Sequence, residues 1–234
     1  MNLCWLASDS APDAFPDVEL ALDEPEGLLA AGGDLKTERL IEAYRRGIFP
    51  WYENGQPILW WCPDPRTVLV PENLHVSRSL RRTIRRSFFR ISIDKDFAGV
   101  IAGCAAERAG QNGTWITPAM REAYLAMHDR GMAHSIEVWH DERLVGGIYG
   151  VSLGRVYFGE SMFSRMNDAS KVALVELVSL LQNWNFALID CQISSAHLQT
   201  MGSSLMPRKR FVELIARLCS EQPNPAAWSA KNST

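Results

Sequence analysis

Apolar and polar positions follow different patterns in two parts of the chain. The first part shows little regularity apart from one short helix predicted over residues 38–46, with Thr37 as its N-cap and Gly47 as its stop. Residues 57–66 (PILWWCPDPR) contain too many prolines for a central strand. We interpret this segment as the join between a small N-terminal domain and the rest of the chain.

The later part of the chain has a regular pattern. Apolar residues recur every three or four positions in several segments, which predicts helices. Strand-like runs separated by turn-sized segments predict an antiparallel meander, and a later strand that follows a helix adds a β-α-β passage. This order predicts the α+β class. The predicted helices cover residues 97–108, 118–130, 169–184 and 196–201, with a last helix opened by Pro207; the predicted strands cover residues 133–139, 144–151, 156–163 and 186–193.

A further helix, predicted from Ser77 as its N-cap, carries a stripe of arginines. Guanidinium groups on one face repel one another and destabilise the helix, so we expect the stripe to have an anionic partner. The phosphate backbone of a nucleic acid is the natural candidate, because arginine binds phosphate bidentately with a fixed charge. The alternative is a solvated face whose charges are paired with carboxylates elsewhere. The arginines spaced along this one face are Arg78, Arg81, Arg82, Arg85 and Arg86.

The composition is that of an ordinary globular protein. The chain has 234 residues, of which 47% are hydrophobic and 22% charged, with a formal net charge of −3. These values exclude the disordered and fibrous classes. The net charge hides an asymmetry, because residues 1–60 hold 11 acidic and 4 basic side chains, whereas residues 61–90 hold 2 acidic and 7 basic ones. The basic patch is therefore local, on an otherwise acidic chain.

Nothing in the sequence predicts a membrane span or a metal site. Apolar runs are shorter than the ~20 residues of a span, and the start lacks the basic and apolar regions of a signal peptide. We therefore expect a cytoplasmic protein. The five cysteines are scattered without a CxxC pair, and the five histidines form no HExxH pair. We expect reduced thiols and no metal.

Carboxyl and amide side chains occur on strands that are otherwise apolar. Alternation along the last predicted strand places Asp190 and Gln192 on one face and Cys191 on the other, while Glu160 shares a face with Met162. Such polar groups are costly to bury without a task or a partner. They belong either to a reaction site or to a satisfied pair that stabilises the strand end. We interpret Cys191 as a packed core thiol and not as a nucleophile.

Tryptophans gather at the joins between predicted elements. Trp51, Trp60 and Trp61 flank the domain join, and Trp115 lies between two predicted helices. Aromatic residues in such places more often form pocket walls or interface anchors than random core. Residues 143–150 loosely match the pyrophosphate-binding turn of acetyltransferases, so an acetyl-coenzyme A N-acyltransferase stays open as an alternative.

Several sequence blocks occur together in one order. GESMFSR at 159–165 and LIDCQ at 188–192 are specific enough to make a chance match implausible. From about residue 20 to about residue 211, the chain resembles the bacterial leucyl/phenylalanyl-tRNA–protein transferases. The other blocks are EGLLAAGGDL (26–35), AYRRGIFPW (43–51), PILWWCPDPR (57–66), GTWIT (113–117), AHSIEVW (133–139), LVGGIYGV (144–151) and ASK (169–171).

The resemblance implies a cytoplasmic enzyme that transfers leucine or phenylalanine from aminoacyl-tRNA to the N-terminal arginine or lysine of a protein, which marks that protein for degradation. Because one methylene changes binding by only ~1–3 kcal/mol, we expect methionine to be transferred as well, although less efficiently than leucine or phenylalanine. The implied architecture is a small N-terminal domain at residues 1–64 and a GNAT-like acyltransferase domain at residues 65–234, without coenzyme A or another cofactor. We expect a monomer, with a loosely ordered tail from about residue 221.

The resemblance also assigns roles to individual residues. Asp190 and Gln192 match the family's proposed catalytic pair, and Glu160 matches a carboxylate that lines the same site. Position 157 departs from the family, which usually has phenylalanine there; the hydroxyl group either shifts side-chain preference or points to solvent. By the same match, Trp51 and Trp115 lie around the donor end of the tRNA, Tyr157, Met162 and Ile189 form walls of an apolar side-chain pocket, and Arg81, Arg82, Arg85 and Arg86 face the tRNA.

Aminolysis of an activated ester needs neither a metal nor a covalent intermediate. An N-terminal amine has a pKa of ~7.7–8.0 and is partly uncharged near neutral pH, so positioning can supply much of the rate. We hypothesise that Gln192 orients the amine while Asp190 polarises it and helps disperse the proton. Either Glu160 or Asp190 recognises the cationic side chain of the acceptor. A non-catalytic RNA- or degron-binding module is the second alternative, but it leaves these three residues without a role.

Overall fold

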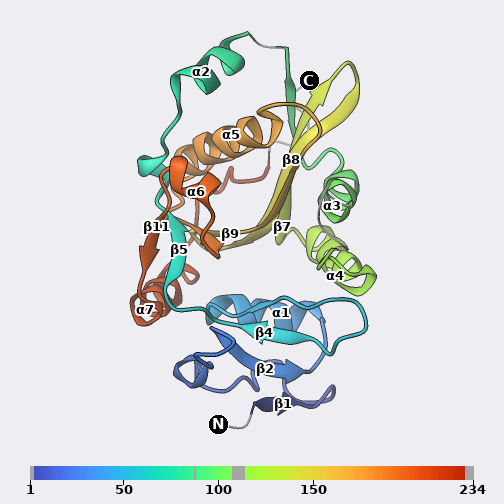
Figure 1. Cartoon of the computed structure of the whole chain (residues 1–234), viewed down its shortest axis with the longest axis vertical. Helices are drawn as coiled ribbons and strands as arrows, with labels where there is room; N and C mark the ends of the chain where they lie inside the picture. Colours follow the sequence, from blue (N-terminus) through green and yellow to red (C-terminus); the bar gives the residue numbers. More distant parts are fainter. Residues whose placement is uncertain (1–2, 87, 107–113, 230–234) are drawn as a thin grey trace.

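Two β-sheets of different size organise the chain (Figure 1). The computed structural model describes residues 3–86, 88–106 and 114–229. A four-stranded sheet forms the small N-terminal part at the bottom of Figure 1, and a seven-stranded sheet forms the larger part above it. The chain passes from one sheet to the other between Trp61 and Arg66. The predicted α+β class is confirmed; the domain boundary between residues 64 and 65 stays a prediction.

The small sheet corrects the expectation of an irregular start. Its elements are β1 (Cys4–Leu6), the 3-10 turn η1 (Val18–Leu20), β2 (Leu28–Gly32), α1 (Thr37–Arg45), β3 (Phe49–Pro50) and β4 (Leu59–Trp61). The strand order is β1-β2-β4-β3, so β4 is a central strand, contrary to our prediction. Strand β4 avoids the expected conflict because its own paired residues, Leu59–Trp61, contain no proline. The N-cap of α1 is Lys36, without a side-chain cap bond, and not Thr37.

The large sheet contains the predicted meander. Its strands are β5 (Arg66–Leu69), β6 (Arg90–Ile93), β7 (Ala133–His140), β8 (Arg143–Leu153), β9 (Val156–Ser164), β10 (Leu188–Gln192) and β11 (Ser204–Met206), in the order β11-β5-β10-β9-β8-β7-β6. Strands β7, β8 and β9 pair antiparallel, as predicted. Strand β10 pairs parallel with β9 and antiparallel with β5. The predicted β-α-β passage is therefore β9, the following helix and β10.

Helices cover both faces of the large sheet (Figure 1). They are α2 (Arg78–Arg85), α3 (Phe97–Ala105), α4 (Pro118–Asp129), α5 (Ala169–Asn183), α6 (Ala196–Thr200) and α7 (Arg208–Leu218), with a 3-10 turn η2 at Pro71–Asn73. Helix α5 packs on one face of β7, β8 and β9, and α3 packs on the other. The sequence predicted that α3 extends to residue 108, and this predicted end lies outside the described residues. In the described part of the chain, no helix is long and apolar enough to cross a membrane.

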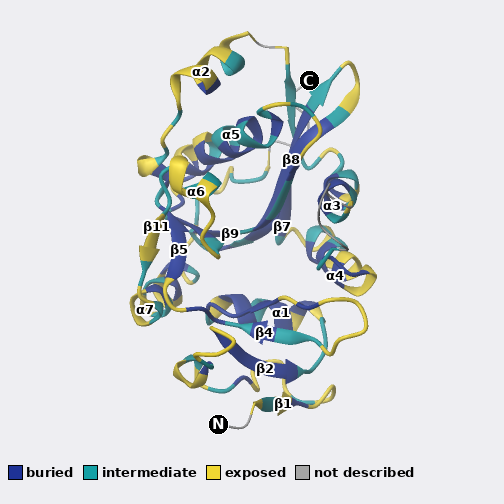
Figure 2. Ribbon diagram, viewed as in Figure 1, coloured by how far each residue is buried: buried dark blue, intermediate teal, exposed yellow. Residues whose placement is uncertain are grey.

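Two core clusters hold this arrangement together. One lies between the large sheet and helices α1, α3, α4 and α7, and it joins the small part of the molecule to the large one. Within it, the rings of Tyr44 in α1 and Phe158 in β9 lie 5.1 Å apart. The other cluster lies between the sheet and α5. Figure 2 shows both as dark strands and helix faces around an exposed periphery. The two sheets therefore share a core instead of meeting at a loose linker.

Two irregularities in strand pairing occur at the polar residues singled out from the sequence. In β9, Glu160 has no partner in β8, because the register shifts at this point. Beyond this bulge the alternation reverses, so Met162 packs on the cluster of Tyr157 and not, as predicted, on the face of Glu160. In β10, the register shifts between Asp190 and Gln192. A bulge changes the direction in which a side chain points. Here Glu160 and Gln192, at the two irregularities, border the same cavity as β3 of the small sheet.

The last described residues pack against the large sheet. The ring of Trp228 stacks on His134 with 4.1 Å between centroids, and the backbone N–H of Asn224 donates to the carbonyl of Trp184 at 3.0 Å. Residues 221–229 thus have packing partners in the large part, and the expectation of a loosely ordered tail stays a prediction. Residues 230–234 lie outside the described part. The aromatic ring at the end of this segment supplies the burial that composition alone did not indicate.

Candidate active site

A small cavity opens where the small sheet meets the large one. Its volume is about 190 Å³, and it is bounded by β3 and the residue that follows it, by Trp115 in the segment before α4, and by the bulged parts of β9 and β10. Four of the predicted site residues border it, namely Trp51, Trp115, Glu160 and Gln192. The full set of lining residues is Phe49, Pro50, Trp51, Trp115, Glu160, Cys191, Gln192 and Ile193.

Glu160 is the carboxyl group that borders this cavity. It is 7% exposed and accepts three hydrogen bonds. The donors are the hydroxyl groups of Tyr44 at 2.7 Å and Tyr124 at 2.6 Å and the side-chain amide of Gln192 at 2.9 Å. Burial raises the pKa of Glu160 to about 7, although the bonds from the tyrosines act in the opposite direction. A carboxyl group with such a pKa can take up and release a proton near neutral pH.

The hydrogen count around Glu160 supports this raised pKa. The hydroxyl oxygens of Tyr44 and Tyr124 also lie 2.7 Å from each other. The two hydroxyl groups and the carboxyl group thus form three oxygen–oxygen contacts, but the hydroxyls supply only two hydrogens. A third hydrogen is present when Glu160 is protonated. The protonated carboxyl group therefore satisfies all contacts of this buried cluster.

Gln192 and Asp190 occupy different positions relative to the cavity. Gln192 lines it and has a φ of +60°, a region that residues other than glycine rarely adopt. Its backbone N–H donates to Asp190 Oδ1 at 2.9 Å. Asp190 is fully buried, and its two carboxylate oxygens accept bonds of 2.8 and 2.7 Å from Nε and Nη2 of Arg66. Gln192 therefore faces the cavity, and Asp190 lies behind it.

Trp51 and Trp115 form aromatic walls of the cavity. They also border a neighbouring cavity of about 890 Å³ that opens along the small sheet. Trp51 is 40% exposed, and its ring lies 5.5 Å from that of Trp61, whose indole N–H donates to the carbonyl of Trp51 at 2.6 Å. An exposed and braced indole beside a cavity offers a surface on which a nucleobase can stack.

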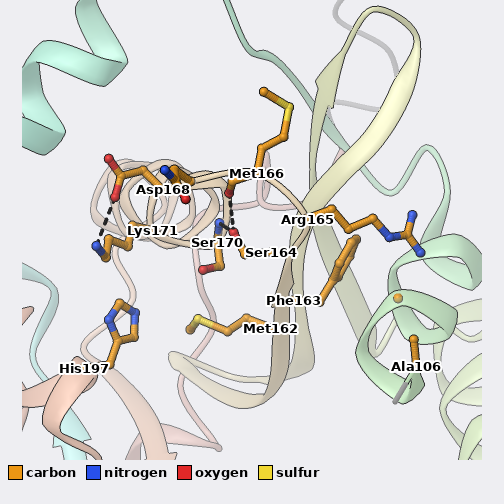
Figure 3. A pocket seen from close by; sticks show the side chains of 12 residues that line it. Ala106, Met162, Phe163, Ser164, Arg165, Met166, Asp168, Ser170, Lys171 and His197 are labelled. Atoms are coloured by element: carbon orange, nitrogen blue, oxygen red, sulfur yellow. Dashed lines mark hydrogen bonds and ion pairs between the residues drawn. The ribbon is translucent and has the colours of Figure 1, made fainter. Parts of the chain in front are cut away.

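Tyr157, Met162 and Ile189 lie together but not around this cavity. Tyr157 and Ile189 are buried in the cluster beneath α5, and the Tyr157 hydroxyl donates to the carbonyl of His134 at 3.1 Å. Met162 is half-buried and lines a separate pocket of about 760 Å³ at the start of α5, shown in Figure 3. The hydroxyl at position 157 is thus satisfied within the core and does not point to solvent.

The arginine stripe lies on the exposed face of α2 (Figure 2). Ser77 is the N-cap, as predicted, and its hydroxyl accepts the N–H of Leu80 at 3.2 Å. Thr83 ties the helix to the start of α5 through a 3.2 Å bond to Asp168. In the part of the chain that the structure describes, no carboxylate forms an ion pair with an arginine of this face. The described residues therefore give no support to internal charge pairing. The arginines of the exposed face are Arg78, Arg81, Arg82, Arg85 and Arg86.

One group of side chains has the residue types of a metal site. Ligand atoms of Asp94, His128 and His134 lie within 4.8 Å of one another. His134 Nδ1 and Asp94 Oδ2 are only 2.7 Å apart, and His128 Nδ1 lies 2.7 Å from the carbonyl oxygen of Ala133. These distances are those of direct hydrogen bonds, which tie Asp94 and both imidazoles to the backbone and side chains of β7 and its flanking turns. We therefore assign the group to the support of β7 and not to catalysis.

Sequence reasoning missed three partners of the predicted site residues. Tyr44 and Tyr124 both lie in segments predicted as helices, but neither was connected with Glu160, which is 116 residues from Tyr44 and 36 from Tyr124. Arg66 was placed in the domain join, with no link to Asp190 at a separation of 124 residues. A signal existed in each case, since a tyrosine on an apolar helix face and an arginine before an apolar strand both need buried partners.

The site has the parts of an enzyme that transfers an acyl group directly to an amine. It combines a carboxyl group of pKa about 7, an amide beside it and aromatic walls. Models of two families match the chain, "Leucyl/phenylalanyl-tRNA protein transferase" over residues 68–216 and the N-terminal domain of the same family over residues 33–64. The chain belongs to the leucyl/phenylalanyl-tRNA–protein transferase family, and it is an aminoacyltransferase.

Curated relatives match over almost the whole chain. The leucyl/phenylalanyl-tRNA–protein transferase of Stutzerimonas stutzeri is 55% identical over 228 residues, which are 97% of this chain and 100% of the relative. That of Aromatoleum aromaticum is 57% identical over 227 residues, 97% of this chain and 94% of the relative. Among solved structures, FemX covers 77% of this chain and 71% of its own at 10% identity and a TM-score of 0.47. A GCN5-related N-acetyltransferase from Kribbella flavida covers 72% and 59% at 9% identity and a TM-score of 0.38.

Replacing Cys191 by alanine is expected to leave the rate of aminoacyl transfer within about threefold of the wild type. The thiol borders the cavity, but burial raises its pKa far above the usual range, so it carries almost no thiolate at neutral pH. The measurement is steady-state transfer from leucyl-tRNA to a peptide, before and after treatment with a thiol-alkylating reagent. Accumulation of an aminoacyl-thioester on Cys191 during turnover would contradict this expectation.

Proposed function

We propose that this protein transfers leucine or phenylalanine, and less well methionine, from aminoacyl-tRNA to the N-terminal arginine or lysine of acceptor proteins. The reaction takes place in the cavity between Trp51, Trp115, Glu160 and Gln192. The observation that carries this proposal is the meeting of a proton-accepting carboxyl group and an amide with aromatic walls in one cavity. The products are marked for degradation, and the protein acts in the cytoplasm as a monomer.

The chemical step is aminolysis of the ester. The α-amine of the acceptor attacks the ester carbonyl carbon, a C–N bond forms, and the bond from that carbon to the ribose oxygen of the tRNA breaks. The amide oxygen of Gln192 orients the amine by accepting a hydrogen bond. Glu160, whose pKa is about 7, takes the proton that the amine loses and returns it to the leaving ribose oxygen. Asp190 contributes through Gln192, because its own carboxylate is held by Arg66.

The aminoacyl-tRNA donor and the protein acceptor bind through different groups of residues. Trp51 and Trp115 stack against the terminal nucleoside of the donor, and the arginine face of α2 contacts tRNA phosphates. Selection among aminoacyl side chains depends on the cluster beneath α5, through Tyr157, Met162 and Ile189. The cationic side chain of the acceptor, expected from the sequence at Glu160 or Asp190, is matched by other carboxylates, because Arg66 holds Asp190 and Glu160 serves the proton transfer. Glu53 borders the neighbouring cavity of about 890 Å³, and Glu26 borders a further cavity of about 260 Å³ beside Trp51. The individual contacts of α2 are assigned to Arg81, Arg82, Arg85 and Arg86.

The test is transfer of labelled leucine from leucyl-tRNA to a short peptide that begins with arginine. The control is the same peptide with an acetylated N-terminus. We expect label only in the free-amine peptide, because the reaction needs the uncharged amine as its nucleophile. A peptide that begins with alanine measures the contribution of the cationic side chain. Label in the acetylated peptide, or equal labelling of the arginine and alanine peptides, would contradict the proposed acceptor.

A further inference from the structure

Arg66 is a buried charge at the meeting point of three parts of the fold. It lies on β5, between β11 and β10, and it is fully buried. Its guanidinium group lies 4.7 Å from the ring centroid of Phe49 in the small sheet and 4.8 Å from that of Phe211 in α7. Among the described residues, Nη1 has no hydrogen-bond partner. Burying a charge pair in this way is poor evidence for stabilisation, because the desolvation cost offsets the attraction.

The pair formed by Arg66 and Asp190 is directly connected to the cavity. Asp190 Oδ1 accepts both Arg66 Nε at 2.8 Å and the backbone N–H of Gln192 at 2.9 Å. Gln192 then donates from its side-chain amide to Glu160 at 2.9 Å. A continuous series of hydrogen bonds thus runs from Arg66 through Asp190 and Gln192 to Glu160. Asp190 is not among the residues that line the cavity.

The conformation of Gln192 needs support from its neighbours. Its φ of +60° coincides with the register shift between β10 and β5. A residue with a side chain keeps such a conformation only where the surrounding structure holds it. The bond from its N–H to Asp190 supplies this support, and the two bonds from Arg66 fix the plane of the Asp190 carboxylate.

We infer that Arg66 is a positioning residue for the transfer reaction. By holding both oxygens of Asp190, it keeps Gln192 in the left-handed turn that places its side-chain amide beside Glu160 at the wall of the cavity. This inference rests on the proposed function, in which Gln192 orients the attacking amine. It assigns Asp190 the same positioning role, in place of direct contact with the amine. Lysine cannot substitute for Arg66, because a single ammonium group does not reproduce the planar pair of bonds.

The kinetic test is a set of double-mutant cycles in the full chain. We expect R66K and D190N each to lower kcat by about 10²-fold, as a misplaced reacting group does, with less than about threefold change in donor Kd and acceptor KM. In a Q192A background, neither substitution lowers kcat further, because each acts through Gln192. The matched control is R208K, since Arg208 bonds the carbonyl of Cys62 and pairs with Glu19 outside this series; it keeps the wild-type kcat.

A second readout does not depend on activity. Hydrogen exchange of the backbone N–H of Gln192 is followed by NMR in the wild type and in the variants. We expect the exchange rate to increase at least tenfold in R66K and in D190N and to stay unchanged in R208K. A tenfold loss of kcat by D190N within the Q192A background, or an unchanged exchange rate at Gln192, would overturn the positioning role. If R66K does not fold, D190N and its cycle with Q192A decide alone. Absence of transfer by the wild type would reject the proposed function, whereas the exchange rates would still decide the role of Arg66.

Discussion

Replacing Glu160 by glutamine is expected to lower kcat for aminoacyl transfer by about 10²–10⁴-fold, the range of a lost general acid–base catalyst. Glutamine keeps the size of the side chain but cannot take up the proton of the amine. In the wild type, the rate rises as pH increases through about 7, where Glu160 loses its own proton. The variant lacks this rise and keeps only the dependence that the acceptor amine causes at ~7.7–8.0. Donor affinity, measured by filter binding of leucyl-tRNA, is the control and stays unchanged. The same pH profile in both proteins would contradict a proton-transfer role for Glu160.

The same substitution changes the dependence of stability on pH. The pKa of Glu160 is about 7 in the fold and 4.5 as its ordinary value, so the folded state holds the proton more tightly than the unfolded state. The resulting stabilisation is complete below pH 4.5 and is lost as pH rises through about 7. At 1.36 kcal/mol per unit, the wild type loses about 3 kcal/mol of unfolding free energy from this group. Urea unfolding at pH 5 and pH 8 is expected to show a smaller loss in E160Q.

Replacing the four arginines Arg81, Arg82, Arg85 and Arg86 by alanine is expected to weaken donor tRNA binding on the order of 10²–10³-fold near 0.1 M salt. Each phosphate contact contributes nearly one unit to the slope of log K against log salt, so the slope falls by about 3–4. Alanine preserves the helix, because these side chains are exposed and form no ion pair with the described residues. The rate at saturating donor stays unchanged, since α2 takes no part in the chemical step.

The control for this prediction removes equal charge from another helix. R81A/R85A and K209A/R210A each delete two exposed cations, the former from α2 and the latter from α7. We expect only the pair on α2 to lower the salt slope. Equal slopes for the two variants would show that overall charge, and not the face of α2, governs donor binding.

Local patterns predicted the helices and the four strands β7 to β10 of the large part, but not the short strands β5, β6 and β11. The helix after Ser77 begins where its N-cap was predicted, and strands β7, β8 and β9 form the expected meander. These features depend on residues close in sequence, such as a serine hydroxyl and the N–H three positions later. The small sheet was not predicted, because its strands are short and pair across distant segments, as β1 does with β2. Such pairing leaves almost no periodic signal.

The candidate site depended on both kinds of information. Alternation and family motifs singled out Glu160, Asp190 and Gln192, but alternation assumed unbroken strands. The bulge in β9 places Met162 on the sheet face opposite Glu160. The register shift in β10 accompanies a Gln192 that lines the cavity, while Asp190 lies behind it. A register shift is decided by what the neighbouring strand can pair with, so one strand's own sequence does not reveal it.

By itself, the sequence determined which residues carry charge and polarity, where the helices other than α1 begin, and to which family the chain belongs. The tertiary structure alone decided which of these groups meet. Tyr44 and Tyr124 raise no expectation of chemistry in their own helices, yet they surround Glu160. Arg66 and Asp190 are far apart in the chain and become a buried pair only when β5 joins β10. The physical reason is that burial and proximity create the shifted pKa of Glu160 and the fixed turn of Gln192, and both arise from the packing of segments that are distant in sequence.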